Sequence, residues 1–168
     1  MRAVRFIGIL CCALVFGLTL SHVLQAPGSR GLDATSWLTV QHSFYGGFAV
    51  VGGLAEIIGL LAAATDAILL RGRARAAAGP LTAAACLLGT LLAYWFGNRP
   101  INAKAAAWTP TTVPADWPAY RDQWEKAHTI SAALGAIALI CLLVATIWQP
   151  ITSRHGHRGT LQRTGNIK

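Results

Sequence analysis

Four long apolar segments decide what this chain can fold into. They run over about residues 4–24, 44–70, 81–97 and 129–148, and each is close to the roughly 17 to 25 residues that a helix needs to cross the hydrocarbon of a bilayer. Only 12% of the 168 residues are charged, which is about half of the usual share in water-soluble domains. We therefore predict an all-α membrane protein, with one four-helix transmembrane domain over residues 1–150 and a basic tail, residues 151–168, that is expected to be disordered.

The basic residues predict the orientation of this bundle. Nine of the fourteen arginines and lysines fall at the N-terminus, between the second and third segments, or in the tail. By the positive-inside rule these three regions are cytoplasmic, so both termini are expected in the cytoplasm. The net charge of +8 therefore reflects topology and attraction to anionic lipid, and we expect no nucleic-acid partner. The predicted location is a cell membrane. The arginine-rich, lysine-poor composition points to a GC-rich bacterial genome, so a bacterial inner membrane is expected.

The first segment also resembles a secretory signal, because it has a charged start, an apolar body and a candidate cleavage point after Ala26. Its apolar run, residues 6–24, is longer than a usual signal core. An even number of spans also agrees with basic residues at both ends of the chain. We expect a retained first helix.

The outer stretch between the third and fourth spans, residues 98–128, is the candidate functional region. Its three tryptophans, of six in the chain, alternate with polar side chains, and flat apolar walls with a few oriented donors are typical of small-ligand pockets. Gly97 and Pro100 are expected to end the third helix, and Asp116 to cap a fourth that begins near Pro118. That helix is too long for the membrane, so its first turns should project. We expect a lid over the outer mouth of the bundle.

Three histidines occupy equivalent depths in this topology. His22 lies where the first span ends, and His42 and His128 lie where the second and fourth begin. In an up-down bundle all three would lie near the outer mouth. Imidazole serves both as a transition-metal ligand and as a general base, but this spacing matches no recognised ligand motif, and we assign no metal. The alternative is that these histidines hydrogen-bond to loop carbonyls at the water boundary.

Glu56 is the strongest single oddity, because it lies near the middle of the second span. A charged side chain at the bilayer centre costs on the order of 3 kcal/mol, so Glu56 is expected to face the bundle interior. It would serve there either as a structural hydrogen bond between helices or as part of a cavity. At helical spacing, His42, Gly46, Ala49, Gly53 and Glu56 form one small, polar face. Such a face suits a helix interface or a cavity wall.

The motif NRPIN (Asn98–Asn102), a downstream Trp108 and the stretch DWPAYRDQWEKAH (Asp116–His128) add a resemblance. Together with the four-span layout, they resemble the anthrone-oxygenase-like family of small four-helix membrane proteins. Fungal members oxidise anthrones to anthraquinones with molecular oxygen and without a dedicated cofactor. The resemblance implies no cofactor here, with oxygen as a co-substrate. By motif it marks Asn98, Asn102, Trp108, Arg121 and Trp124.

Three functions follow as hypotheses. The first is an oxygenase acting on a hydrophobic small molecule, a flat phenolic or quinol-like compound that partitions into the lipid bilayer. In it His128 removes a proton, and Arg121, Asn98 and Asn102 stabilise the resulting enolate. The substrate site is expected to include Trp108, Trp124, His22, His42 and Glu56. The second is a non-enzymatic accessory or binding protein whose outer loop docks a protein partner of unknown identity. The third is a haem or metal protein that uses the three histidines.

Overall fold

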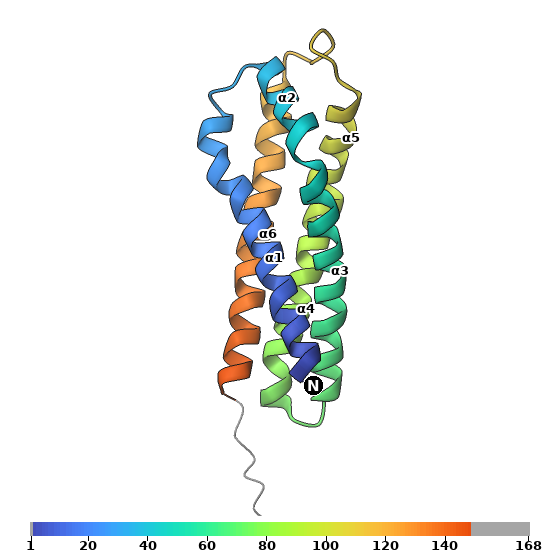
Figure 1. Cartoon of the computed structure of the whole chain (residues 1–168), viewed down its shortest axis with the longest axis vertical. Helices are drawn as coiled ribbons and strands as arrows, with labels where there is room; N and C mark the ends of the chain where they lie inside the picture. Colours follow the sequence, from blue (N-terminus) through green and yellow to red (C-terminus); the bar gives the residue numbers. More distant parts are fainter. Residues whose placement is uncertain (1, 149–168) are drawn as a thin grey trace, which may run out of the picture.

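A computed structural model describes residues 2–148 and shows four long helical columns side by side (Figure 1). They are α1 (Arg2–Ser29), α3 (Gly46–Leu69), a column that begins with α4 (Ala74–Ala93), and α6 (Trp117–Ile147). Each of the four is long and apolar enough to cross a membrane. Both α1 and α4 pack against α3 and α6. The predicted four-helix bundle is confirmed, and the predicted tail, residues 151–168, lies outside the described residues.

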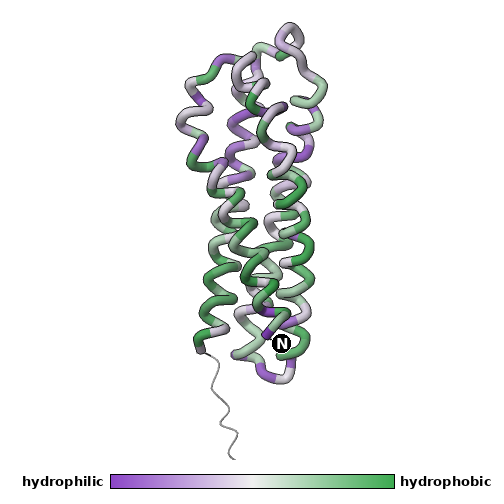
Figure 2. The backbone as a smooth tube through the Cα atoms, viewed as in Figure 1, coloured by the Kyte–Doolittle hydropathy of each residue, from purple (hydrophilic) through white to green (hydrophobic). Residues whose placement is uncertain are grey.

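The hydropathy of the bundle changes along its length. Figure 2 shows hydrophobic residues along the middle of the columns and hydrophilic residues at the two ends. The first residues of α1 and the last residues of α6 lie at one end, and α2 (Ala34–Phe44) and α5 (Arg99–Ala107) lie at the other (Figure 1). This layout suits a multi-pass protein in a lipid bilayer. We call the end that carries α2 and α5 the outer end.

The third column differs from the prediction at both ends. It begins at Ala74, with Pro80 inside the helix, and it continues past α4 through a π-helical turn, η1 (Tyr94–Asn98), directly into α5. The expectation that Gly97 and Pro100 end the helix is therefore wrong. Pro100 lies in the first turn of α5, where proline is well tolerated. The connection to α6 is consequently short, residues 108–116.

A cap covers the outer end, and we define it as α2, α5 and the connection 108–116. Asp33 begins α2 by accepting a 2.9 Å hydrogen bond from the backbone amide of Ser36, which holds the pKa of Asp33 below its ordinary value. A small apolar core then joins α2 to α5 and to the start of α6, and its buried members are Trp37, Leu38 and Ala105. The cap thus has a core of its own.

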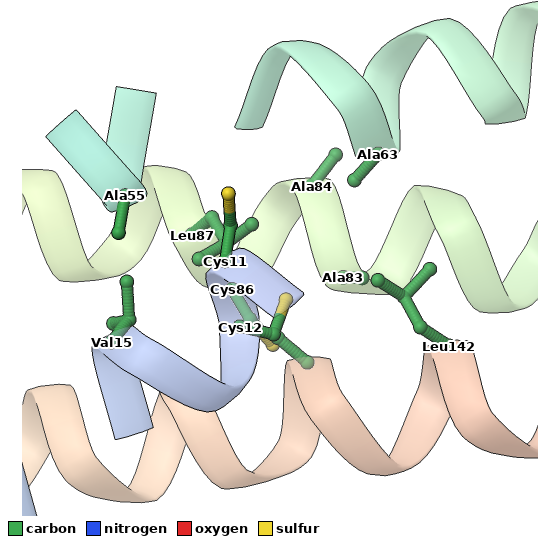
Figure 3. Packing of buried hydrophobic residues seen from close by; sticks show 11 residues of the cluster. Cys11, Cys12, Val15, Ala55, Ala63, Ala83, Ala84, Cys86, Leu87 and Leu142 are labelled. Atoms are coloured by element: carbon green, nitrogen blue, oxygen red, sulfur yellow. The ribbon is translucent and has the colours of Figure 1, made fainter. Parts of the chain in front are cut away.

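The main core of the bundle is built from small residues. Most of its buried members are alanines and cysteines, and Figure 3 shows Cys12, Val15, Leu87 and Leu142 among them in the space between the helices. A side chain at Gly59 would lie only 2.9 Å from the Cβ of Cys11. Small residues allow this close approach of membrane helices. All four cysteines are free.

A buried ion pair ties three helices together near the end opposite the cap. Nε of Arg5 donates to Oδ2 of Asp66 over 2.7 Å, and Nη1 of Arg5 donates to the carbonyl of Ala145 over 2.9 Å. Asp66 is fully buried, and Arg5 is 6% exposed. Ionisable residues at membrane depth are expected to be paired in this way. The pair joins α1 to α3 and α6.

Candidate functional site

The candidate site is a cavity of about 680 Å³ in the outer half of the bundle, a volume within the usual range for small-molecule pockets. It lies where α3 faces α4, η1 and α5, and α1, α2 and α6 complete its walls. Most of its lining is apolar. Its polar lining residues are Thr19, His22, Gln41, His42, Tyr45, Glu56, Tyr94, Asn98, Asn102, Trp124 and His128.

The cavity exists because α3 presents few side chains on this side. Ala49, Gly52 and Gly53 line it, and a Cβ added at Gly53 would meet nothing within 4 Å. The small face predicted for this helix is thus a cavity wall. His42 and Glu56 also belong to that wall, whereas Gly46 is not among the lining residues.

Two of the three outer histidines meet inside this cavity. The rings of His22, from α1, and His128, from α6, lie 4.2 Å apart between centroids. Trp124 packs edge-on against both rings, at 4.9 and 4.2 Å, and Tyr45 packs on His22 at 4.7 Å. The depth argument therefore places these two histidines correctly. The result is an imidazole pair enclosed by aromatic rings.

The imidazole pair has unused hydrogen-bonding capacity. Nδ1 of His22 and Nδ1 of His128 are both enclosed, and neither has a hydrogen-bond partner within residues 2–148. Buried polar atoms without a partner are uncommon in folded proteins and call for an explanation. Both Nδ1 atoms are closed off from the cavity in this arrangement, so a ligand hydroxyl or oxyanion would partner them after a rotation of the imidazole rings.

Asn98 and Asn102 hold Trp124 in place from the third column. Nδ2 of Asn98 donates to the Trp124 carbonyl over 3.0 Å, and Nε1 of Trp124 donates to Oδ1 of Asn102 over 2.9 Å. A carbonyl only accepts and an indole N–H only donates, so both amide orientations are determined. Nδ2 of Asn102, at the cavity wall, is therefore left to donate elsewhere. The π-helical turn ends at Asn98, which is 2% exposed.

His42 has a different role from the pair. Its Nε2 lies 2.9 Å from the carbonyl oxygen of Ala105, so Nε2 carries the proton and donates. This bond joins α2 to α5 at the edge of the cavity. Hydrogen bonding to a carbonyl, one of the two alternatives from the sequence, is what the structure shows for His42.

Glu56 lies at the inner end of the cavity. It is 9% exposed, and its carboxyl group interacts with the side chain of Thr90 across the α3–α4 interface. The Thr90 hydroxyl also lies 2.8 Å from the carbonyl of Leu87. Glu56 is therefore both a helix-to-helix contact and part of the cavity lining, which combines the two alternatives considered for it.

Arg121 and Trp108 do not line the cavity. The Arg121 guanidinium donates to Asp122 over 3.0 and 3.2 Å, lies 4.0 Å from a carboxylate oxygen of Glu125, and stands 5.2 Å from the Trp117 ring. Glu125 also accepts from Arg30, at 2.9 and 3.0 Å. These contacts bind the start of α6 to the end of α1. These contacts hold the Arg121 guanidinium outside the cavity, whereas a residue that stabilises an enolate would have to lie inside it.

Trp108 packs in the cap, 6.5 Å from Trp37 and 5.3 Å from Tyr120 between ring centroids. It supports the outer end without touching the imidazole pair. Tyr45, in contrast, was not singled out from the sequence, although it lies at the junction of α2 and α3 and contacts His22. Its position beside two glycines gives no signal of an inward-facing ring.

The three histidines do not converge as a ligand set. Within the described residues, no group of three or more His, Cys, Asp or Glu side chains is arranged to hold a metal ion. The contact of His42 with a backbone carbonyl accounts for its separation from the pair.

Comparisons of the chain with models of protein families, with curated proteins and with solved structures give no match.

Proposed function

We propose that this protein is a membrane oxygenase, similar to the anthrone-oxygenase-like family, that acts without a cofactor on a flat phenolic or quinol-like compound dissolved in the bilayer. The observation that carries the proposal is the enclosed pair of His22 and His128, with unpartnered Nδ1 atoms, in a mostly apolar cavity of about 680 Å³. A base next to a dry, aromatic-lined space is suited to removing a weakly acidic proton from a lipophilic ring compound.

The chemistry begins with proton removal. His128 takes a proton from the ring CH₂ of the keto (anthrone-like) form of the substrate, which is conjugated through the aromatic rings with the carbonyl, and the His22 ring packs against His128 at 4.2 Å between centroids. The enolate oxygen accepts a hydrogen bond from Nδ2 of Asn102, a residue at the exposed edge of the cavity whose orientation is fixed by its bond to Trp124. Oxygen then adds to the carbanion and, with the proton returned by His128, gives a hydroperoxide on the same carbon. The O–O bond breaks as this carbon gives up its second hydrogen, which leaves C=O and releases the outer oxygen as water. Overall, CH₂ and O₂ give C=O and H₂O.

The aromatic residues position the ring system in this scheme. Trp124 is fixed by its hydrogen bonds to Asn98 and Asn102, and its ring packs against both histidines. Asn98, Arg121 and Trp108 are then positioning residues. Arg121 and Trp108 act at a distance by holding the start of α6 and the cap.

A lipophilic substrate can reach the cavity from the hydrocarbon. Ile57 on α3, Leu92 on α4 and Trp95 on η1 all line the cavity, and they are also 52%, 49% and 54% exposed on the outside of the bundle. These residues form a rim between α3 and the third column. A compound dissolved in the bilayer would pass this rim without crossing the cap.

The cavity lies at the outer end, opposite the first residues of α1 and the last residues of α6. With both termini in the cytoplasm, as the basic residues predict, the imidazole pair would lie near the far face of a cell membrane. We include this orientation in the proposal.

The direct test is oxygen uptake by the purified protein in lipid nanodiscs with an anthrone as substrate. His128→Ala is expected to reduce turnover by roughly 10²- to 10⁴-fold, the usual contribution of a positioned general base. Gln123→Ala is the matched control, because Gln123 is an exposed polar residue of the same helix. Turnover by His128→Ala equal to that of the control would refute the role of His128.

A wild-type protein that binds the compound and consumes no oxygen would favour the second hypothesis, a binding protein. Binding is measured separately, by quenching of tryptophan fluorescence. The two measurements thus separate a wrong residue from a wrong reaction.

A further inference from the structure

The cavity has two polar ends separated along the bundle. At the outer end, Phe48 of α3 contacts His22, with ring centroids 5.1 Å apart. Glu56 lies eight residues further along the same helix, a rise of about 12 Å. The facing column gives the same spacing, because Thr90, the partner of Glu56, precedes Asn98 by eight residues. Two helices therefore place Glu56 about two turns below the imidazole pair.

On α3 the wall between these two ends carries only small residues, Ala49, Gly52 and Gly53. The facing column contributes Leu91, Leu92, Tyr94 and Trp95, and α1 contributes Leu18 and Thr19. A side chain at Gly53 would enter open space. The cavity is therefore an elongated slot whose lining is mostly apolar, with a polar group at each end.

We propose that the slot binds a flat, elongated ligand lengthwise, and that Glu56 selects ligands with a hydroxyl or carbonyl at the end remote from the imidazole pair. This inference rests on the proposed function for the identity of the outer end. It adds a specificity-determining residue and the requirement for a polar group at each end of the ligand.

A carboxyl group is chemically suited to this role. When protonated it both donates and accepts, so it can pair with a hydroxyl or with a carbonyl. A buried polar group left without its partner is costly, so a site built around such a group discriminates against ligands that lack the partner. The Thr90 hydroxyl beside Glu56 donates to the Leu87 carbonyl over 2.8 Å, so the carboxyl group of Glu56 keeps hydrogen-bonding capacity for a ligand.

The competing explanation is that Glu56 serves only to join α3 to α4. The two explanations differ in what happens to ligand preference. If Glu56 only joins helices, its replacement changes the affinity for every ligand in the same proportion. If Glu56 binds the polar group at the remote end of the ligand, its replacement removes the preference for ligands with two polar ends. The affinity for a ligand with a polar group only at the imidazole end then stays the same.

The experiment compares two probes that do not react with oxygen: 2,6-dihydroxyanthraquinone, with a hydroxyl at each end of the ring system, and 2-hydroxyanthraquinone, which has only one. Affinities are measured in lipid nanodiscs from the quenching of tryptophan fluorescence. Wild type is expected to bind the first probe about 10- to 100-fold more tightly. Equal affinities in wild type would overturn the proposal, and this arm needs no variant.

Three variants complete the experiment. Glu56→Leu should lose the preference and bind 2-hydroxyanthraquinone as wild type does. Glu56→Gln should retain most of the preference, because an amide also donates and accepts. Thr90→Val removes the helix contact and keeps the carboxyl, so it should retain the preference as well. A Glu56→Leu protein that weakens both probes equally, or a Thr90→Val protein that behaves like Glu56→Leu, would overturn the inference.

The outcome is independent of the oxygenase test. If wild type shows the preference but consumes no oxygen, the proposed reaction fails and the binding mode stands. If oxygen uptake depends on His128 but wild type binds both probes equally, the reaction stands and the role of Glu56 fails.

Discussion

Gly97 and Gly53 offer the same substitution with opposite expected effects. A Cβ added at Gly97 would lie 2.5 Å from the Cβ of Ala127, whereas one added at Gly53 would meet nothing within 4 Å. Replacing a helical glycine by alanine normally stabilises by roughly 0.5–1 kcal/mol. At Gly53 this gain should appear in full. At Gly97 it is opposed by a steric overlap.

The size of that overlap sets the expected cost. Ordinary contacts begin near 3.4 Å, so the third column and α6 must separate by about 1 Å at Gly97, and overpacking of this kind costs about 1–3 kcal/mol. The separation also strains the 3.0 Å hydrogen bond from Asn98 to the Trp124 carbonyl, which contributes about 1 kcal/mol. We expect Gly97→Ala to lower the free energy of unfolding by about 1–3 kcal/mol.

The assay is unfolding of both variants in mixed detergent micelles with increasing denaturing detergent, followed by tryptophan fluorescence. Relative to wild type, the free energy of unfolding should decrease for Gly97→Ala and increase for Gly53→Ala. Equal shifts, or a more stable Gly97→Ala protein, would refute the close packing of η1 on α6.

Two further predictions concern the buried ion pair and the rim of the cavity. Arg5→Met or Asp66→Leu alone should lower the free energy of unfolding by about 3–5 kcal/mol, because each leaves the other charge of the pair buried, and Arg5→Met with Asp66→Leu should be close to neutral. Unfolding in mixed micelles measures this, and additive single effects would contradict it. Leu92→Trp should narrow the rim and slow the binding of 2-hydroxyanthraquinone in stopped-flow quenching. Leu61→Trp, on a residue that is 63% exposed and does not line the cavity, should bind at the wild-type rate, and equal slowing in both variants would exclude access at the rim.

The sequence predicts the bundle because bilayer thickness imposes a length that apolar segments report directly. Helix ends are harder to predict, because glycine and proline are local signals that packing can override. Gly97 does not end its helix, since the absence of a side chain is what lets the column approach Ala127. Pro100 does not end it either, because proline is compatible with the first turn of α5.

The candidate site could also be predicted only in part from the sequence. Depth in the membrane was enough to bring His22 and His128 together, because both lie at the same level of adjacent helices. Depth says nothing about rotation around a helix axis, so it could not tell that Arg121 faces Asp122 and Glu125. Asp66 was missed although it is an acidic residue in an apolar span, the same signal that singled out Glu56.

The π-helical turn Tyr94–Asn98 sets the direction in which the side chains of α5 face relative to those of α4. A π-turn amounts to one residue inserted into an α-helix, and one residue corresponds to about 100° of rotation. Every side chain of α5, including Asn102 beside Trp124, therefore faces its present direction because of that insertion. A deletion that restored a regular α-helix at this turn would rotate α5 by about 100° relative to α4. It would break the hydrogen bond of Asn102 with Trp124 and the packing of α5 against α2, so the mouth of the cavity depends on this one turn.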